Sequence, residues 1–255
     1  NGLGYLFSNN FKAKLIKLLL KTFIKKSFNK SFKEIIFQNE SDKEIFLKFS
    51  GYSGRISLIK GSGIELNNYI KKETYQTEKL KVIFVSRLLI DKGVNNYIEL
   101  TKNILDSNID FYLAGEIDDG NPNSITQKDL EKIKNLDNVK YIGSINVEKE
   151  LFNYDISVIM SKYEGFSRIL LESLYIGLFC ISNNIPGTRW LKEFNNGFLV
   201  ENNNLNSISK VINNFKEYGF SKADAESNRE IIKKKYSTKI ISNQYNEIYN
   251  NLASS

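Results

Sequence analysis

The stretch from Ile156 to Glu172, ISVIMSKYEGFSRILLE, decides the fold of this chain. It opens with an apolar run, continues through a glycine-containing turn and ends in a segment whose apolar residues recur with helical spacing. That order predicts a strand over 156–160, a turn, and a helix that starts near Phe166. Glu164 then lies beside the helix N-terminus, and Glu172 lies about two turns farther along the helix.

This arrangement of two carboxylates around a helix N-terminus suits a phosphate-bearing sugar ligand. Free backbone N–H groups and the helix dipole favour an anion, and carboxylates accept hydrogen bonds from sugar hydroxyls. Taken alone, the two glutamates are more simply explained as solvated helix residues, with Glu172 paired to Arg168 four positions before it. The sequence on either side decides between these interpretations.

Strands and helices alternate along the chain from residue 81 onward. Strands are expected at 81–85, 109–114, 139–142, 156–160, 178–182 and 198–200, and helices at 94–105, 124–135, 149–154, 166–176, 205–218 and 222–251. The alternation predicts an α/β, Rossmann-like fold with a parallel sheet and helices on both faces. Ligands of such sheets bind beyond the carboxyl ends of the strands. Arg87 and Lys92, which follow one strand, therefore face the same crevice as Glu164, which follows another.

The N-terminal part of the chain carries a different pattern. Residues 11–32 have the pattern of a basic amphipathic helix. Three interpretations fit it: a helix of an incomplete domain, which is the default, a helix on an anionic membrane, or a nucleic-acid-binding helix, for which base-reading motifs are lacking. Strands are expected at 35–37 and 55–60, and a capping box at 41–44 is expected to open another helix. A turn or hinge is expected at 61–63.

Composition excludes several classes of site. The chain of 255 residues has no histidine and one cysteine, so it can build neither a Cys/His zinc site nor a Ser-His-Asp triad. Cys180 lies in an apolar run, where buried packing is its expected role. Asp118 and Asp119 lie in a polar loop that turn chemistry explains. The net charge of +7 leaves nucleic acid, anionic membranes and phosphorylated substrates open as partners.

Several ordered motifs resemble those of retaining glycosyltransferases of family 4, which have the GT-B fold. EGFSRILLE matches the Glu-x7-Glu motif of that family, and SRLLIDKG at 86–93 resembles its G-R-L-x3-K-G segment, with Ser86 in place of the usual glycine. Further landmarks follow at family spacing, namely Gly177 and the segments 179–182, 185–188 and 196–200. The resemblance covers nearly the whole chain and is sharpest over 82–200.

The resemblance implies a role for individual residues. Arg87 and Lys92 would neutralise the diphosphate of a nucleotide sugar, Glu172 would hold its ribose hydroxyls, and Glu164 would contact the transferred sugar. Backbone N–H groups from 166 to 169 would meet the distal phosphate, whereas Arg168 is left out of the set. The implied donor-binding set is Arg87, Lys92, Ile142, Glu164, Gly165, Phe166, Ser167, Ile169 and Glu172, with Glu164, Arg87 and Lys92 as its catalytic members. For Ile142 a plain strand-to-loop junction is an equally good explanation.

The resemblance also implies a domain organisation. Residues 1–62 would be the tail of an N-terminal, acceptor-side domain, and residues 63–255 the C-terminal donor-binding domain with its terminal helices. The chain is therefore interpreted as a fragment of a longer protein. We expect it to be inactive by itself, because the acceptor half of the cleft would be absent.

The function implied is transfer of a glycosyl unit, with retained anomeric configuration, from a UDP-sugar to a sugar hydroxyl in bacterial surface-glycan synthesis. The acceptor would be a glycan or a polyprenyl-linked oligosaccharide. Neither a metal nor a cofactor is implied, because the nucleotide sugar is a substrate, and nucleic acid is not expected as a partner. The location would be cytoplasmic, with peripheral membrane contact as a further option. A GT-B nucleotide-sugar epimerase and a non-catalytic nucleotide-sugar-binding module remain the alternatives.

Overall fold

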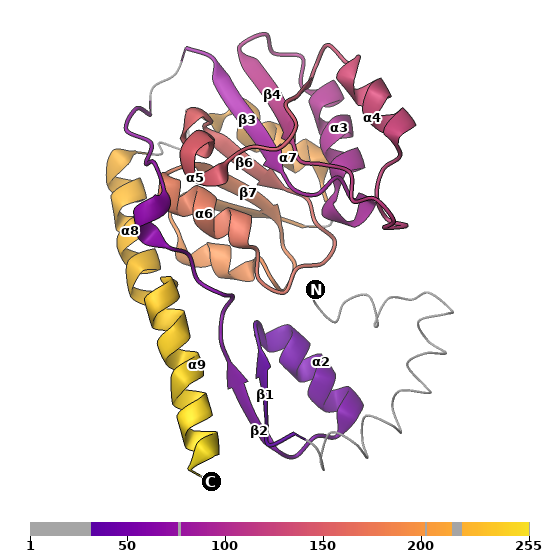
Figure 1. The fold of residues 1–255 in the computed structure, drawn as a ribbon. Coiled ribbons are helices and arrows are strands. Elements are labelled where there is room, and N and C mark those ends of the chain that lie inside the picture. The colour runs from indigo at the N-terminus through magenta and orange to yellow at the C-terminus, as the bar shows by residue number, and fades with distance from the viewer. Residues whose placement is uncertain (1–31, 76–77, 202, 216–220, 255) are drawn as a thin grey trace.

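The computed structural model describes residues 32–254 except 76–77, 202 and 216–220 (Figure 1). Its main body is a six-stranded sheet of order β5-β4-β3-β6-β7-β8, in which every pairing is parallel. The strands are β3 (Leu80–Val85), β4 (Ile109–Ala114), β5 (Lys140–Tyr141), β6 (Ile156–Ile159), β7 (Phe179–Asn183) and β8 (Gly197–Val200). All six strands and the parallel, Rossmann-like sheet predicted from the sequence are confirmed.

Helices cover both faces of this sheet, as Figure 1 shows. Val82 and Phe84 of β3 belong to the apolar core of one face, while Ile83 between them belongs to the core of the other. The first face packs against α3 (Val94–Asn103), α4 (Gln127–Lys134) and α7 (Leu205–Asn213). The second packs against α5 (Val147–Glu150), α6 (Arg168–Ile176) and α8 (Lys222–Lys235). Because side chains alternate between faces, a strand that is apolar throughout must be covered on both sides.

Helix α6 is the most deeply buried of the covering helices that position the site. Seven of its nine residues are buried, which is why its sequence is apolar almost all round. Each fully buried Leu or Ile contributes roughly 1.5–3 kcal/mol to folding. The helix is therefore fixed firmly against the sheet, and the residues at its N-terminus are fixed with it.

The residues before the main sheet form a small unit of their own. β1 (Glu34–Phe37) and β2 (Arg55–Leu58) pair in parallel, and α2 (Glu40–Ser50) connects them. The unit packs around Phe37, Phe46 and Tyr52. The expected helix over 11–32 lies outside the described residues, apart from its last position. No helix in the described part of the chain combines the length and apolar character needed to cross a bilayer.

Two expectations about helix ends are wrong. The box at 41–44 does not open α2, because the cap lies two positions before Ser41, at Asn39, whose Oδ1 accepts a hydrogen bond from Asp42 N. The single helix expected over 222–251 is two helices, α8 and α9 (Thr238–Ala253). The break has a tertiary cause. Ile64 pairs with the backbone there, since its N–H donates to Tyr236 O and its carbonyl accepts from Thr238 N.

Smaller differences concern boundaries alone. The helix expected over 124–135 starts at Gln127, because Thr126 and Asp129 form a capping box before it. The helix expected over 149–154 is α5 followed by the 3₁₀ turn η4 (Leu151–Asn153), and the strand expected over 139–142 shrinks to β5. Short 3₁₀ turns also occur at η2 (Leu66–Asn68), η3 (Ile90–Lys92) and η5 (Arg189–Glu193). Cys180 is buried in β7, as expected.

We predict that Asn39→Ala lowers the free energy of unfolding by about 0.5–2 kcal/mol, the usual cost of losing an N-cap side chain. Urea unfolding followed by circular dichroism measures this change. Ser41→Ala is the matched control, because Ser41 lies in the first turn of α2 but does not cap it. A larger loss for Ser41→Ala than for Asn39→Ala would contradict the observed cap.

Candidate functional site

A pocket of about 460 Å³ opens at the carboxyl ends of β3 and β6. These neighbouring strands are where the strand order reverses, since β4 and β5 lie on one side and β7 and β8 on the other. Ligand sites of open α/β sheets occur at such a switch point. The pocket is lined by Phe84, Val85, Ser86, Arg87, Lys92, Ile159, Ser161, Glu164, Phe166, Ser167, Arg168, Ile169 and Glu172.

The structure brings most of the predicted site residues together here. Arg87, Lys92, Glu164, Phe166, Ser167, Ile169 and Glu172 all line the pocket. Gly165 and Ile142 are not among the lining residues. The carbonyl of Gly165 accepts a hydrogen bond from Asn39 Nδ2 at 2.9 Å. The backbone N–H of Ile142 donates to Leu113 O, and its side chain packs against the core beneath α6.

Lys92 and Glu164 form an ion pair across the pocket. Lys92 Nζ lies 2.6 Å from Glu164 Oε1, and the same oxygen accepts a hydrogen bond from Ser161 Oγ at 2.7 Å. Both charged side chains are mostly buried. The sequence predicted that they would face one crevice, and the contact confirms it. Ser161 was missed, although its place three positions before Glu164 in the same turn gave a local signal.

The two turns that carry this pair are packed backbone against backbone. Gly93, which follows Lys92, has φ +88, and a Cβ at that position would stand 2.3 Å from Met160 O. The backbone N–H of Lys162 donates to Asp91 O at 2.8 Å, which ties the turns together directly. Only glycine permits both this φ and this approach. Lys92 therefore reaches Glu164 from a fixed backbone.

Glu172 is held by two donors at the other side of the pocket. Its Oε1 accepts hydrogen bonds from Tyr69 Oη and from Arg168 Nε, each at 2.8 Å. The ion pair between Glu172 and Arg168, which the sequence analysis gave as the simpler explanation of Glu172, is thus present. Glu172, however, is only 8% exposed, so it is not a solvated helix residue. The hydrogen bond to Glu172 raises the pKa of Arg168, whereas burial, followed by the charge of Glu172, raises the pKa of Tyr69.

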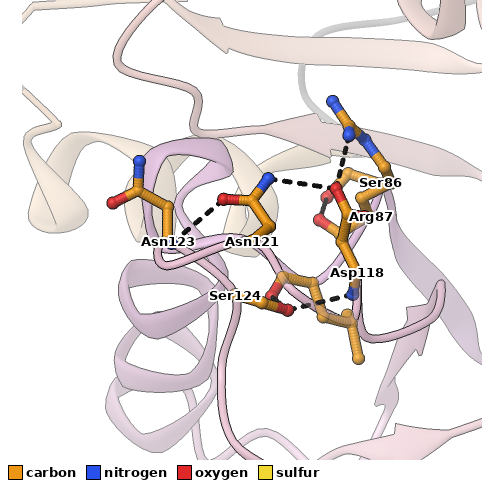
Figure 2. A network of polar contacts seen from close by, with 7 residues as sticks. Ser86, Arg87, Asp118, Asn121, Asn123 and Ser124 are labelled. Carbon is orange, nitrogen blue, oxygen red and sulfur yellow. Dashed lines mark hydrogen bonds and ion pairs between the residues drawn. The ribbon is translucent and has the colours of Figure 1, made fainter.

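Arg87 lies at the rim of the pocket, where the loop after β4 reaches it. Figure 2 shows the Arg87 guanidinium against Asp118, with Nη1 and Oδ2 2.5 Å apart. Asp118 is fixed in turn, since Oδ2 accepts from Asn121 Nδ2 and its backbone N–H donates to Ser124 Oγ. The sequence assigned Asp118 to turn chemistry alone and so missed this contact. Arg87 is 57% exposed, and such pairs exchange partners at little cost.

The N-terminus of α6 supplies an unsatisfied polar group. Ser167 is its N-cap and only 2% exposed, yet its Oγ makes neither a capping bond nor any other hydrogen bond within the described chain. The sequence placed the start of this helix near Phe166, whereas the helix begins at Arg168, because the backbone of Ser167 is still extended. The Phe166 ring stacks on Trp190, with centroids 4.7 Å apart. Ser167 N already donates to Gly187 O. Ser167 Oγ is covered by the surrounding protein. The donors that the pocket offers an anion are therefore the first-turn amides that follow Ser167.

We predict that Gly187→Ala lowers the free energy of unfolding by about 1–3 kcal/mol, the usual cost of overpacking. A Cβ there would stand 2.2 Å from Glu164 O, and this backbone atom cannot move as a flexible side chain would. Chemical denaturation measures the loss, with Lys192→Ala as an exposed control from the neighbouring turn η5. A wild-type midpoint for Gly187→Ala would show that the Glu164 turn is not packed as described.

Comparisons with known proteins agree on one family. The family model described as "Glycosyl transferases group 1" matches residues 67–238. An N,N'-diacetylbacillosaminyl-diphospho-undecaprenol alpha-1,3-N-acetylgalactosaminyltransferase from Campylobacter jejuni is 27% identical over 263 residues, covering 97% of this chain and 68% of the relative. A poly(ribitol-phosphate) alpha-N-acetylglucosaminyltransferase from Staphylococcus aureus is 28% identical over 203 residues, covering 72% of this chain and 39% of the relative.

Solved structures share the fold. TarM superposes with a TM-score of 0.73 at 23% identity, over 91% of this chain and 46% of that one. HepE from Anabaena, solved in complex with UDP-glucose, gives a TM-score of 0.76 at 18% identity, over 94% of this chain and 68% of that one. The chain thus spans less than half the length of TarM and about two thirds of HepE.

Proposed function

The chain belongs to the group 1 family of glycosyl transferases, and from that premise we propose that it forms the donor-binding part of a retaining glycosyltransferase of bacterial surface-glycan synthesis. One observation carries the proposal. Lys92, Arg87, Glu164 and Glu172 converge with the N-terminus of α6 on a single pocket at the switch point of the sheet. This set offers cations and amides to a diphosphate, and carboxylates to hydroxyl groups.

Different residues of the pocket suit different parts of a nucleotide sugar. The diphosphate would lie at the N-terminus of α6, where the first-turn amides, Lys92 and Arg87 stand in reach. Glu172, deeper along α6, would accept from the ribose hydroxyls, and Glu164 from hydroxyls of the transferred sugar. Ile142 remains a proposed nucleobase neighbour. The complex of HepE with UDP-glucose supports uridine as the base.

The cations have a chemical task in the proposed reaction. As the bond between the anomeric carbon and the diphosphate oxygen breaks, negative charge gathers on the leaving diphosphate. Lys92 and Arg87, already fixed in place, stabilise that charge. The acceptor hydroxyl attacks the same face of the sugar, and the departing diphosphate takes its proton. Because the side chains supply the positive charge, we propose that neither a metal nor another cofactor is needed.

The acceptor side of the reaction would involve the residues before the donor domain. We assign residues 1–62 to the tail of an acceptor-side domain and residues 63–255 to the donor domain. The acceptor would be a glycan or a polyprenyl-linked saccharide, which the undecaprenol in the name of the Campylobacter relative supports. Transfer to such an acceptor would take place in the cytoplasm, at the membrane surface. Nucleic acid is not proposed as a partner. Neither alternative, the epimerase nor the binding module, gains support, since both curated relatives are named as glycosyltransferases.

UDP should stabilise the chain in a thermal-shift titration. A ligand present at 100 times its Kd adds about 2.7 kcal/mol to the stability of the state that it binds, which raises the melting temperature by several degrees. Uridine, which lacks the diphosphate, is the control and should give a much smaller shift. EDTA should leave the UDP response unchanged. A response that requires Mg²⁺ or Mn²⁺ would contradict the metal-free proposal, and no response to any nucleoside diphosphate would contradict the donor site itself.

Calorimetry should separate the two glutamates. Glu172→Ala removes an acceptor for the ribose and should weaken UDP binding by roughly 1.5–3 kcal/mol, the worth of a hydrogen bond to a charged group. Glu164→Ala should bind UDP almost normally but lose affinity for a UDP-sugar. Glu247→Ala is the matched control, since it removes the same charge from an exposed position on α9. Wild-type affinity for UDP in Glu172→Ala would remove the ribose assignment.

A further inference from the structure

Tyr69 holds the carboxylate of Glu172 from outside the α6 helix. It follows η2, in the segment that leads into the six-stranded sheet, and lies 103 positions before its partner. Its Oη donates to Glu172 Oε1 at 2.8 Å, and the residue is 6% exposed. Arg168, the other donor to this oxygen, has a mostly exposed side chain. Tyr69 therefore provides the buried and more constrained of the two hydrogen bonds.

The backbone on either side of Tyr69 is anchored to the donor domain. Ile70 N donates to Glu148 O at 2.8 Å, and Lys72 N donates to Ile176 O at 2.9 Å. Lys72 also forms a buried ion pair with Asp155, 2.9 Å between Nζ and Oδ1. The Tyr69 ring meets Tyr175 edge to face, with centroids 5.8 Å apart. The hydroxyl is thus fixed in space, and the carboxylate has to orient toward it.

This geometry leaves one carboxylate oxygen for a ligand. Both donors bind Oε1, and Oε2 accepts no hydrogen bond from the residues that the structure describes. Glu172 lines the pocket. A carboxylate whose one oxygen is pinned presents the other in a fixed direction, and it can then accept from vicinal hydroxyls without first being ordered. We propose that Tyr69 is a positioning residue that aims Glu172 at the ribose 2′- and 3′-hydroxyls of the nucleotide.

The inference rests on the proposed function, because it takes the ligand to be a nucleoside diphosphate. It also predicts an effect on ligand selectivity, which a purely structural role for Tyr69 would not produce. Removing the Tyr69 hydroxyl should weaken the recognition of the ribose hydroxyls and leave the binding of the diphosphate and the base unchanged. Discrimination between ribose and a sugar without these hydroxyls is therefore the property to measure.

The experiment compares the binding of UDP and of 2′,3′-dideoxy-UDP to the wild-type chain and to Tyr69→Phe by calorimetry. Tyr69→Phe should bind UDP about 5- to 10-fold more weakly, which is less than the full worth of a hydrogen bond to a charged group, because Arg168 still holds Oε1. Its affinity for dideoxy-UDP should stay at the wild-type value. Tyr175→Phe is the matched control. It removes the hydroxyl of the other ring of the pair, which is not among the hydrogen-bond donors to Glu172 in the described residues, and should change neither affinity.

A second variant tests the path through Glu172. Glu172→Gln should by itself reduce the preference for UDP over dideoxy-UDP, and adding Tyr69→Phe to it should cause no further loss, since the two residues act as one unit. Equal losses for UDP and dideoxy-UDP in Tyr69→Phe would overturn the inference in favour of a structural role. The inference would also be overturned if Glu172→Gln kept the wild-type preference for UDP over dideoxy-UDP, and this test does not depend on whether Tyr69→Phe folds. If either result is found while the wild-type chain binds UDP, the inference about Tyr69 fails but the proposed function stands. If the wild-type chain binds no nucleotide, both the inference and the proposed function are overturned.

Discussion

The pocket depends on the direct backbone contact between the turn after β3 and the turn after β6. Gly93 lies so close to Met160 O that no side chain fits between them, and Lys162 N donates to Asp91 O across the junction. Both turns leave adjacent strands of the sheet, β6 buried throughout and β3 buried at its centre, so their positions are set by the sheet. With the backbones locked, Lys92 and Glu164 have to meet, and the cost of ordering their side chains is met during folding and not during binding.

The two glutamates differ in the partners that hold them. Glu164 pairs with Lys92, a cation for which a negatively charged ligand would compete. Glu172 lies on a helix that is buried nearly all round and keeps two donors on a single oxygen. Arg87 differs from both, because its exposed pair with Asp118 is easily exchanged. The site thus combines a rigid floor, formed by α6 and the two turns, with one cation that is free to change partners.

The sequence predicted the features that depend on neighbouring residues and missed those that depend on contacts between residues far apart in the chain. The alternating apolar runs located all six strands, and Arg87, Lys92, Glu164 and Glu172 stood in motifs a few residues long. The cap of α2 was misplaced because Asn39 and Ser41 are equally good caps by type, and only the fold selects one of them. The break between α8 and α9 results from pairing with Ile64, which is far away in the sequence. Tyr69 and Asp118 could not be predicted as site residues, since they reach their partners across 103 and 31 positions without any local pattern.

A crystal structure of the chain with UDP would be the most direct test of the donor site at the N-terminus of α6. We predict the diphosphate at the N-terminus of α6, with one oxygen within hydrogen-bond distance of a first-turn amide and another near Lys92 Nζ. The ribose hydroxyls should lie against Glu172 Oε2 while Tyr69 Oη keeps its bond to Oε1. Electron density for UDP at another place on the sheet would contradict the account, as would a diphosphate turned away from α6.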